Sequence, residues 1–421
     1  MAPRSPDDWQ MLHYEAMQLF SPSAPVDEAD LFAGRQVQIR KLIETVLERG
    51  KHAVLFGERG VGKTSLAKVF RVLFPALVSE VRLIRQQLNA DDSFSEVWKK
   101  IFKEIEVVVR SDGEEKRITA ADFYDSTISA DDVVREIKTA FGGNEIPVIV
   151  FDEFDRATES VRRQMANVVK DLSDDSVNAT VVIVGVSDDI GGLLAEHASL
   201  KRCLEQVPMP RMSNDEMKEI INKRIPRLGM KIEPNGLWKI VILSRGLPSY
   251  VHLLGVYSVQ EAISGRKLLI TEAHVDAAIT RALEKSQESV RSDYAAAIHT
   301  NRTDTLFQEV LLSCALAKTD DRGFFTPQSV VDPLASILKK SVKIANFQNH
   351  LKEFIGKDRG AILIRRGKER AYKFRFSDPM MQPYIIMRGV EGGLIQTNAL
   401  DVLSSPEQPQ FQFPTAPQKP S

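Results

Sequence analysis

The segment that most constrains this chain is the glycine-rich octapeptide GERGVGKT at residues 57–64. It fits the pattern G-x-x-x-x-G-K-[ST] and lies between an apolar run, residues 52–56, and a segment with helical periodicity. Glycines let successive backbone N–H groups turn toward an anion, and the following helix adds the positive end of its dipole. A chance glycine-rich turn is the alternative, and the strand-to-helix context argues against it. We therefore expect a phosphate-binding loop formed by Gly57, Glu58, Arg59, Gly60, Val61, Gly62, Lys63, Thr64 and Ser65.

A second acidic motif supplies what such a loop needs to work on a triphosphate. The apolar run at residues 148–151 ends in Asp152 and Glu153. In this context we expect ATP with Mg²⁺: Lys63 reaches the β- and γ-phosphates, while Thr64 and Asp152 hold the metal. Glu153, one residue further, is then expected to polarise the attacking water. A solvated acidic strand end is the alternative interpretation of the pair.

Another apolar run, residues 180–186, ends in Ser187. A hydroxyl at the tip of a neighbouring strand can donate to the γ-phosphate or to the water, whereas an ionised carboxylate cannot. We interpret Ser187 as a catalytic contact, with an ordinary turn as the alternative.

The order of periodic segments predicts the architecture. Strands alternating with helices up to about residue 210 indicate an α/β fold, a doubly wound parallel sheet around the phosphate loop. The expected divisions are an N-terminal segment (1–30), the P-loop α/β domain (31–210), an α-helical lid (211–300), a winged-helix domain (301–395) and a disordered tail (396–421). In detail, we expect no regular element in the polar, proline-interrupted residues 1–30, a helix ending at Pro75, and an exposed loop at 110–118.

Composition excludes several classes of protein. With 56 Lys and Arg against 57 Asp and Glu, the chain is close to neutral, and 43% hydrophobic residues exclude wholesale disorder. No apolar run is long enough to span a bilayer, and the first ten residues lack the plan of a signal peptide. Two distant cysteines, Cys203 and Cys314, favour neither a disulfide framework nor a zinc site, so we expect a cytoplasmic protein.

These motifs, in this order, resemble the AAA+ superfamily of P-loop ATPases. Residues 31–35 (LFAGR) resemble the box that precedes the P-loop, which implies that Phe32 covers the adenine. The Asp152–Glu153 pair resembles the second nucleotide motif of that family, and Ser187 resembles its first sensor. Residues 197–202 (HASLKR) resemble the segment that carries an arginine finger, so the resemblance implies that Arg202 acts on the γ-phosphate of a neighbouring subunit. From the residues alone, Arg202 is a helix-end cation that a surface salt bridge would also explain.

The later part of the chain is similar to the origin-recognition-type initiators and to the STAND signalling ATPases. The initiator branch places a second sensor arginine in a Gly-x-x-Arg helix, but here Ser249 holds that position. Gly246-Leu247-Pro248 is instead similar to the Gly-x-Pro motif of STAND proteins, which implies that Pro248 packs against adenine. Together these resemblances imply a slow ATPase that acts as a nucleotide-held switch and forms homo-oligomers.

A basic region lies near the C-terminus. Between residues 339 and 375 there are twelve Lys and Arg but three Asp and Glu, which predicts a positively charged face. In a DNA-binding winged helix, a helix enters the major groove and the hairpin contacts phosphates, so duplex DNA is the expected partner. A protein-docking surface, as in a STAND-like signalling or defence scaffold, and a merely solvated face are the alternatives. The candidate DNA contacts are Lys352, Arg365, Arg366, Lys368 and Arg370.

Overall fold

The computed structural model describes residues 5–22, 26, 28–77, 81–111, 114–125, 127–140, 145–186, 200–300, 305–320, 322–368 and 371–395. The chain divides into two compact units, one of residues 1–286 with 378–383 and the other of residues 287–377 with 384–421. The predicted disordered tail, residues 396–421, lies outside the described residues. No helix in the described ranges is long and apolar enough to cross a membrane.

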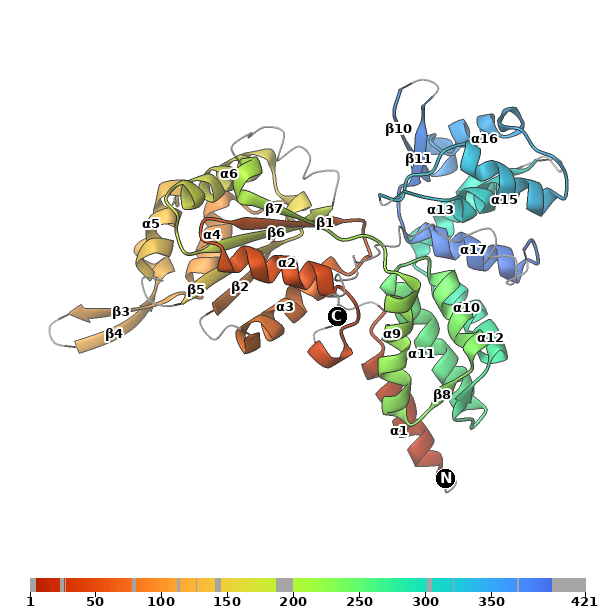
Figure 1. The fold of residues 1–421 in the computed structure, drawn as a ribbon, viewed down its shortest axis with the longest axis horizontal. Coiled ribbons are helices and arrows are strands. Elements are labelled where there is room, and N and C mark those ends of the chain that lie inside the picture. The colour runs from red at the N-terminus through yellow and green to blue at the C-terminus, as the bar shows by residue number, and fades with distance from the viewer. Residues whose placement is uncertain are drawn as a thin grey trace, which may run out of the picture. The chain divides into compact units, whose positions relative to one another are not determined.

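A five-stranded parallel sheet forms the centre of the first unit (Figure 1). Its strand order is β2-β5-β6-β1-β7, which confirms the predicted α/β class. Because all neighbours are parallel, β1, β5 and β6 end at the same edge of the sheet, and loops that follow them meet there. The strands are β1 (His52–Gly57), β2 (Val81–Gln87), β5 (Ile146–Asp152), β6 (Thr180–Val186) and β7 (Leu204–Pro208).

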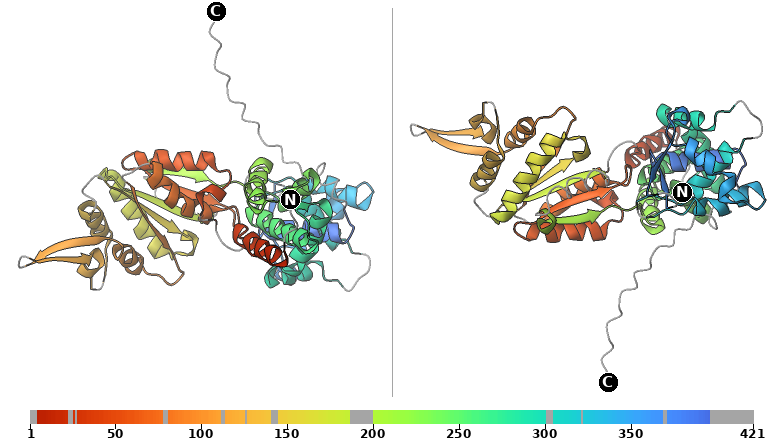
Figure 2. Two further views of the ribbon diagram at one scale, coloured as in Figure 1. Left: turned by 90° about the horizontal axis from the view of Figure 1, so that it is seen from below. Right: turned by 90° about the horizontal axis from the view of Figure 1, so that it is seen from above.

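Helices cover both faces of this sheet (Figures 1 and 2). Helices α2 (Gln36–Leu47) and α3 (Lys63–Leu77) cover one face. The opposite face packs against α4 (Phe94–Phe102), α5 (Ala130–Ala140) and α6 (Glu159–Asp174), around a core that includes Trp98 and Phe151. Apolar strands with helices on both sides explain why the residues of the three central strands, β5, β6 and β1, are almost all buried. The four-residue helix α8 (Leu200–Cys203) precedes β7.

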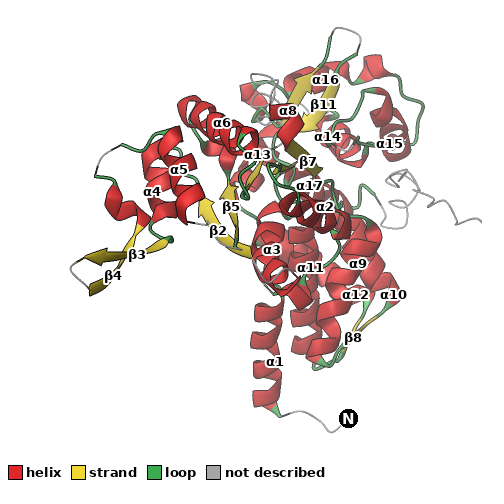
Figure 3. Cartoon of the chain, turned by 60° about the vertical axis from the view of Figure 1, so that its left-hand side comes forward, coloured by secondary structure: helices red, strands yellow, loops and turns green. Residues whose placement is uncertain are grey.

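A group of helices, the lid, completes the first unit. Figure 3 shows these helices beside the part of the unit that contains the parallel sheet. It contains α9 (Asn214–Arg224), α10 (Pro234–Ser244), α11 (Pro248–Ser264) and α12 (Glu272–Glu284). A capping box of Ser213 and Glu216 begins α9. Two short strands, β8 (Lys231–Ile232) and β9 (Leu269–Ile270), pair within the lid.

The second unit contains helices and one antiparallel hairpin. The antiparallel hairpin joins β10 (Leu363–Arg366) to β11 (Lys373–Phe376). Its helices are α13 (Glu288–Ile298), α14 (Phe307–Leu316), α15 (Gln328–Leu338), α16 (Gln348–Glu353) and α17 (Met381–Glu391), the last beginning in the 378–383 segment. Short 3-10 turns lie at Ala29–Leu31, Ala120–Phe123, Phe154–Arg156, Ile225–Leu228, Ile344–Asn346 and Lys357–Arg359.

The expectation of no regular element before residue 30 is wrong. Residues Pro6–Leu19 form α1, which begins with a capping box of Ser5 and Asp8 and packs on α11. A Cβ on Gly255 of α11 would lie 2.5 Å from the ring of Phe20, so only glycine lets that ring approach the helix. The signal was present in the sequence as a cap followed by proline at the first helical position.

Two further expectations are wrong. Helix α3 continues two residues past Pro75, because a proline in the last turn removes only one backbone hydrogen bond. Instead of the expected loop at 110–118, the described residues of this range lie in two paired antiparallel strands, β3 (Glu106–Ser111) and β4 (Glu114–Thr119). Its many charged side chains masked the alternation that marks a strand.

Candidate functional site

The loop after β1 has the backbone shape that its glycines predict. Gly60 and Gly62 have φ values of +84° and +95°, which residues with a side chain rarely adopt. A Cβ on Gly57 would lie 2.3 Å from the carbonyl oxygen of Met209, so this position requires glycine for close packing. The loop therefore turns tightly from β1 into the N-terminus of α3.

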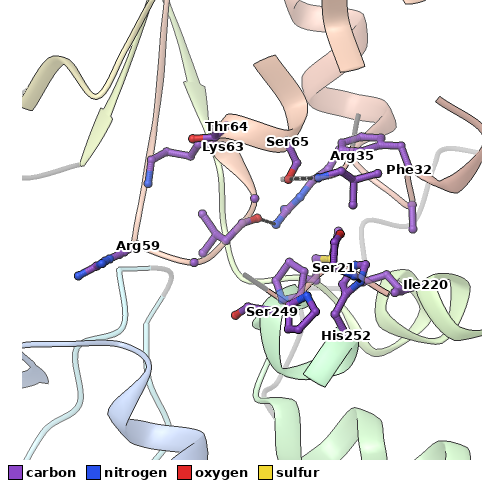
Figure 4. Close-up of a pocket in the computed structure, with 18 of the residues that line it drawn as sticks. Ser21, Phe32, Arg35, Arg59, Lys63, Thr64, Ser65, Ile220, Ser249 and His252 are labelled. Carbon is purple, nitrogen blue, oxygen red and sulfur yellow. Dashed lines mark hydrogen bonds between the residues drawn. The ribbon is translucent and has the colours of Figure 1, made fainter. Parts of the chain in front are cut away.

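Lys63, the first residue of α3, folds its ammonium group back onto this loop. Its Nζ donates to the carbonyl oxygen of Glu58 at 2.7 Å and to that of Gly57 at 3.0 Å. Burial lowers the pKa of Lys63 to about 8, against the opposing effect of nearby carboxylates, of which Asp155 is the strongest. Lys63 is thus a desolvated cation at the mouth of the loop (Figure 4).

Thr64 and Asp152 come together although 88 residues separate them in sequence. Thr64 follows β1, Asp152 ends β5, and the Thr64 Oγ1 lies 3.5 Å from Asp152 Oδ1. Asp152 is 2% exposed, and its other oxygen, Oδ2, accepts from Nη2 of Arg85 at 2.5 Å. A hydroxyl and a carboxylate facing each other are oxygen ligands of the kind that Mg²⁺ prefers.

Glu153 is held by a different set of partners. Its backbone lies in the left-handed region, with φ of 56°, directly after the strand. Its Oε2 accepts from Gln87 Nε2 at 3.0 Å and from Arg156 Nε at 3.0 Å. The two adjacent carboxylates therefore have separate environments, Asp152 buried and Glu153 about one-third exposed.

The end of β6 is held by a residue that the sequence did not single out. Asp155 Oδ1 accepts from the backbone N–H of Val186 at 3.2 Å, and Asp155 lines the same cavity as Lys63. Ser187, the predicted sensor that follows Val186, lies outside the described residues.

These groups share one cavity of about 460 Å³ with an apolar end. Of the predicted residues, Gly57 and Glu58 do not line it; those that do are Phe32, Arg59, Gly60, Val61, Gly62, Lys63, Thr64, Ser65, Asp152, Glu153 and Pro248. Met212 and Ile220 add further apolar surface. A polar end beside an apolar end suits a molecule that carries phosphates on a planar base.

Two connections attach other segments to this cavity (Figure 4). The buried guanidinium of Arg35 donates to the carbonyl oxygen of Val61 at 2.8 Å, and burial lowers the pKa of Arg35. The residues after α1 are fixed by Ser21, whose N–H donates to His252 Nδ1 of the lid at 3.1 Å, and by Val26, whose N–H donates to Ser65 Oγ at 3.2 Å. N-terminal segment, P-loop and lid therefore meet at one site.

Arg211 links the P-loop to the segment 378–383, which belongs to the same unit. Its Nε donates to Glu58 Oε2 at 2.7 Å, and its Nη1 donates to the side chain of Gln382. Glu58 is 5% exposed, so it serves as a buried anchor for Arg211 and lies outside the cavity lining. In the same segment, the carbonyl of Met380 accepts from the hydroxyl of Tyr250 at 2.7 Å.

Arg202 lies away from these groups. It lies in α8, two residues before Leu204, the first residue of β7, which pairs with His52 at the beginning of β1. The P-loop follows the C-terminal end of β1, so Arg202 lies near the opposite, N-terminal ends of the strands. It lines a depression there with Arg49, Lys170 and Cys203. Arg202 therefore cannot serve the cavity of its own chain.

In the second unit, the basic side chains fall into two groups. Arg375 is 8% exposed and packs over Phe324, and Arg359 donates to the carbonyl of Ala297, so both are internal. The predicted Lys352, Arg365, Arg366 and Lys368 are exposed, and Arg370 lies outside the described residues.

Sequence reasoning missed the residues that hold the acidic pair and the loop. Arg85 carried a usable signal, because a charged residue in a strand covered on both faces needs a buried partner. Gln87, Arg156 and Arg211 are polar or charged residues of the kind usually found on the surface. Only the tertiary structure shows which partners they have.

Comparisons with known proteins identify a family and solved structures to which this chain is similar. The family model of the novel STAND NTPase 1 proteins matches residues 14–316. A Walker-type ATPase of Pyrococcus abyssi has a similar fold, with a TM-score of 0.50 and 17% identity over 88% of this chain and 99% of that chain. The ORC2 protein of Aeropyrum pernix, solved in ADPNP–ADP complexes, gives a TM-score of 0.49 and 13% identity over 89% of this chain and 98% of that one. No curated protein matches the sequence.

Proposed function

This chain belongs to the novel STAND NTPase 1 family, and on that premise we propose that it binds ATP with Mg²⁺ and hydrolyses it slowly as a nucleotide-dependent switch. The observation that carries the proposal is the shared cavity. Lys63, Thr64 and Asp152 lie at its polar end, while Phe32 and Pro248 line it where a base would pack. Backbone amides of the P-loop and the N-terminus of α3 would bind the phosphates.

The residues present fit a magnesium ion. Thr64 and Asp152 would hold it, since their oxygens face each other at 3.5 Å. When bound, Mg²⁺ supplies charge neutralisation to the phosphate oxygens. Lys63 would exchange its two loop carbonyls for phosphate oxygens, which are stronger acceptors because they are charged.

For hydrolysis we assign Glu153 as the group that orients and polarises the water. Leaving Gln87 and Arg156 would free its carboxylate for that role. Arg202 would stabilise the γ-phosphate charge in a neighbouring copy, which suits its position at the far edge of the sheet. Ser187, the next residue in the sequence after β6, would donate to the γ-phosphate.

The switch proposal rests on the parts that meet at the cavity. Pro248 and Ser249, at the start of α11, line it, so a bound nucleotide would bridge lid and P-loop. Through Arg211, the P-loop is also joined to the segment that follows the C-terminal hairpin. A ligand that binds one arrangement of these parts more tightly shifts the population toward it.

Particle size tests this switch. We expect the purified chain to form larger particles with ATP than with ADP or without nucleotide, by light scattering coupled to gel filtration. The Glu153→Gln variant should hold the ATP-dependent size for longer, because hydrolysis no longer resets it. Equal sizes in all three states would contradict assembly as the output.

Duplex DNA is the partner that we propose for the second unit. Arg365 and Arg366 lie in β10, Lys368 follows that strand, and all three are exposed. Lys352 lies on the polar side of α16. The association constant for DNA falls as salt rises, so log K against log salt has a negative slope. Replacing the three hairpin cations by Ala should make this slope less negative by about two to three, because phosphate contacts are lost. Lys267→Ala with Lys285→Ala, exposed in the lid, is the matched control. No binding of the parent protein at low salt would remove the DNA proposal.

The family match also favours a second candidate, a STAND-like scaffold in which the second unit docks a protein partner and slow hydrolysis times assembly. It predicts the same nucleotide-dependent particle sizes without any effect of DNA. Cys203 and Cys314 are buried free thiols, which supports action in the reducing cytoplasm for either candidate.

A further inference from the structure

The feature that carries this inference is an arginine bonded to the carboxylate that the proposed function assigns to the metal. Arg85 lies in β2, next to β5, where it pairs in register with Val150. Its Nη2 reaches toward the last residue of β5 and donates to Asp152 Oδ2 at 2.5 Å. The side chain of Arg85 is 19% exposed and that of Asp152 is 2% exposed, so water screens this ion pair little.

The two oxygens of Asp152 have different partners. Oδ2 is bonded to Arg85, whereas Oδ1 accepts from the N–H of Glu153 at 2.9 Å and faces the hydroxyl of Thr64 at 3.5 Å. The guanidinium therefore fixes the carboxylate from the side away from Thr64. Because a guanidinium stays protonated in proteins, its charge is a permanent part of the site.

We propose that Arg85 is a positioning residue that sets the affinity of this site for a divalent cation. Resting on the proposed function, the inference assigns it two effects. Arg85 keeps Oδ1 directed toward Thr64, and its positive charge offsets the negative charge of Asp152. Because the charge of Asp152 is neutralised, the site attracts a free cation weakly. The cation binds firmly only together with a nucleotide, whose phosphates add negative charge. In Arg85→Met the effect of the uncompensated negative charge should exceed the loss of orientation, because the N–H of Glu153 still holds Oδ1.

The test measures the Mg²⁺ dependence of nucleotide affinity in full-length variants, using a fluorescent ATP analogue. Arg85→Met removes the charge while keeping much of the packing, and Arg85→Lys keeps the charge. Arg82→Met is the control, since Arg82 is in the same strand and donates to the carbonyl of Glu104, away from Asp152. We expect the Mg²⁺ concentration at half-maximal affinity to fall about tenfold in Arg85→Met and to change less than twofold in the other two.

An unchanged or higher Mg²⁺ midpoint in Arg85→Met would overturn the inference, as would a Lys variant that behaves like the Met variant. Should Arg85→Met fail to fold, Arg85→Gln replaces it, because glutamine keeps a donor to Asp152 without the charge; its midpoint should also fall. The two proposals fail differently. If the parent protein binds no nucleotide at any Mg²⁺ concentration, the proposed function fails; if it binds and all midpoints coincide, the role of Arg85 alone fails.

Discussion

The ammonium group of Lys63 donates to the carbonyl oxygen of Glu58 at 2.7 Å, so the cation meant for phosphates is bonded to its own loop. The two carboxylates are likewise bonded to side chains of the same chain, Asp152 to Arg85 and Glu153 to Arg156. Internal partners thus satisfy the charges of Lys63, Asp152 and Glu153, which lowers the cost of removing these groups from water. Nucleotide binding would exchange the partners of Lys63 and Glu153 for phosphates and water, whereas Asp152 would keep Arg85 at Oδ2 while it helps to hold the metal.

The first prediction concerns the pH dependence of nucleotide affinity. Burial lowers the pKa of Lys63 to about 8, and a bound triphosphate would raise it again. Binding then takes up a proton above pH 8, so the association constant should be level from pH 7 to 8 and fall by up to about tenfold per pH unit above that. Calorimetric titration at pH 7, 8, 9 and 10 measures this. Lys63→Arg, which does not titrate in this range, should show no fall; a level profile to pH 10 in the parent protein would refute the assignment.

The second prediction concerns Glu153. Glu153→Gln should leave ATP affinity within about twofold and slow hydrolysis by at least about 10²-fold, because the amide cannot take up a proton from water. Phosphate release in single-turnover assays measures the rate. Glu159→Gln, an exposed ion-pair partner of Arg163 in α6, is the control and should behave like the parent protein. Normal turnover in Glu153→Gln would assign the base to another group.

The third prediction tests whether Arg202 acts in a neighbouring copy. Arg202→Ala should bind ATP normally and hydrolyse it about 10²- to 10³-fold more slowly in the assembled state. Mixing it with Lys63→Ala should restore part of the activity, because one variant supplies an intact P-loop and the other an intact Arg202. Arg163→Ala is the surface control. A mixture no more active than its two components would exclude action between copies.

The fourth prediction concerns acid stability. His52 is fully buried, its Nδ1 accepts from the N–H of Val181 at 3.0 Å, and burial lowers its pKa to about 4. The unfolded chain binds this proton below about pH 6.5 while the folded chain does not, so the free energy of unfolding should decrease as pH falls from 6.5 toward 4, by up to about 1.4 kcal/mol per pH unit. His252, with a pKa lowered to about 3 by burial and by Arg224, adds a similar loss.

Urea unfolding at pH 7 and pH 5 checks this prediction. His52→Asn, whose amide oxygen can still accept from Val181, should lose less stability between the two pH values than the parent protein. An equal loss in both proteins would place the acid sensitivity elsewhere.

The sequence predicted the parts of the fold and site that depend on neighbours in the chain. Gly60, Gly62 and Lys63 form a local pattern whose backbone requirements are fixed within eight residues, and the apolar run before Asp152 predicts a buried strand. The parallel sheet follows from the alternation of such strands with helices, and its observed strand order brings Thr64 and Asp152 to one edge.

The sequence could not predict contacts that depend on distant segments. The partners of Arg85, Gln87 and Arg211 lie 67, 66 and 153 residues away, and no local pattern selects them. Helix α1 was missed for another reason: its amphipathic signal is weak, and only Leu12 and Ala16 are buried within it. The hairpin β3–β4 was missed because exposed charged strands lack the apolar alternation on which strand prediction depends.

The most direct test of the central claim is isothermal calorimetry of ATP with Mg²⁺ binding to the folded full-length chain, alongside Lys63→Ala and the matched control Lys68→Ala in the same helix. We expect saturable binding near one ATP per chain for the parent and for Lys68→Ala, and at least about 10²-fold weaker binding for Lys63→Ala. Saturable binding of equal affinity in Lys63→Ala, or no binding to the parent protein, would contradict it.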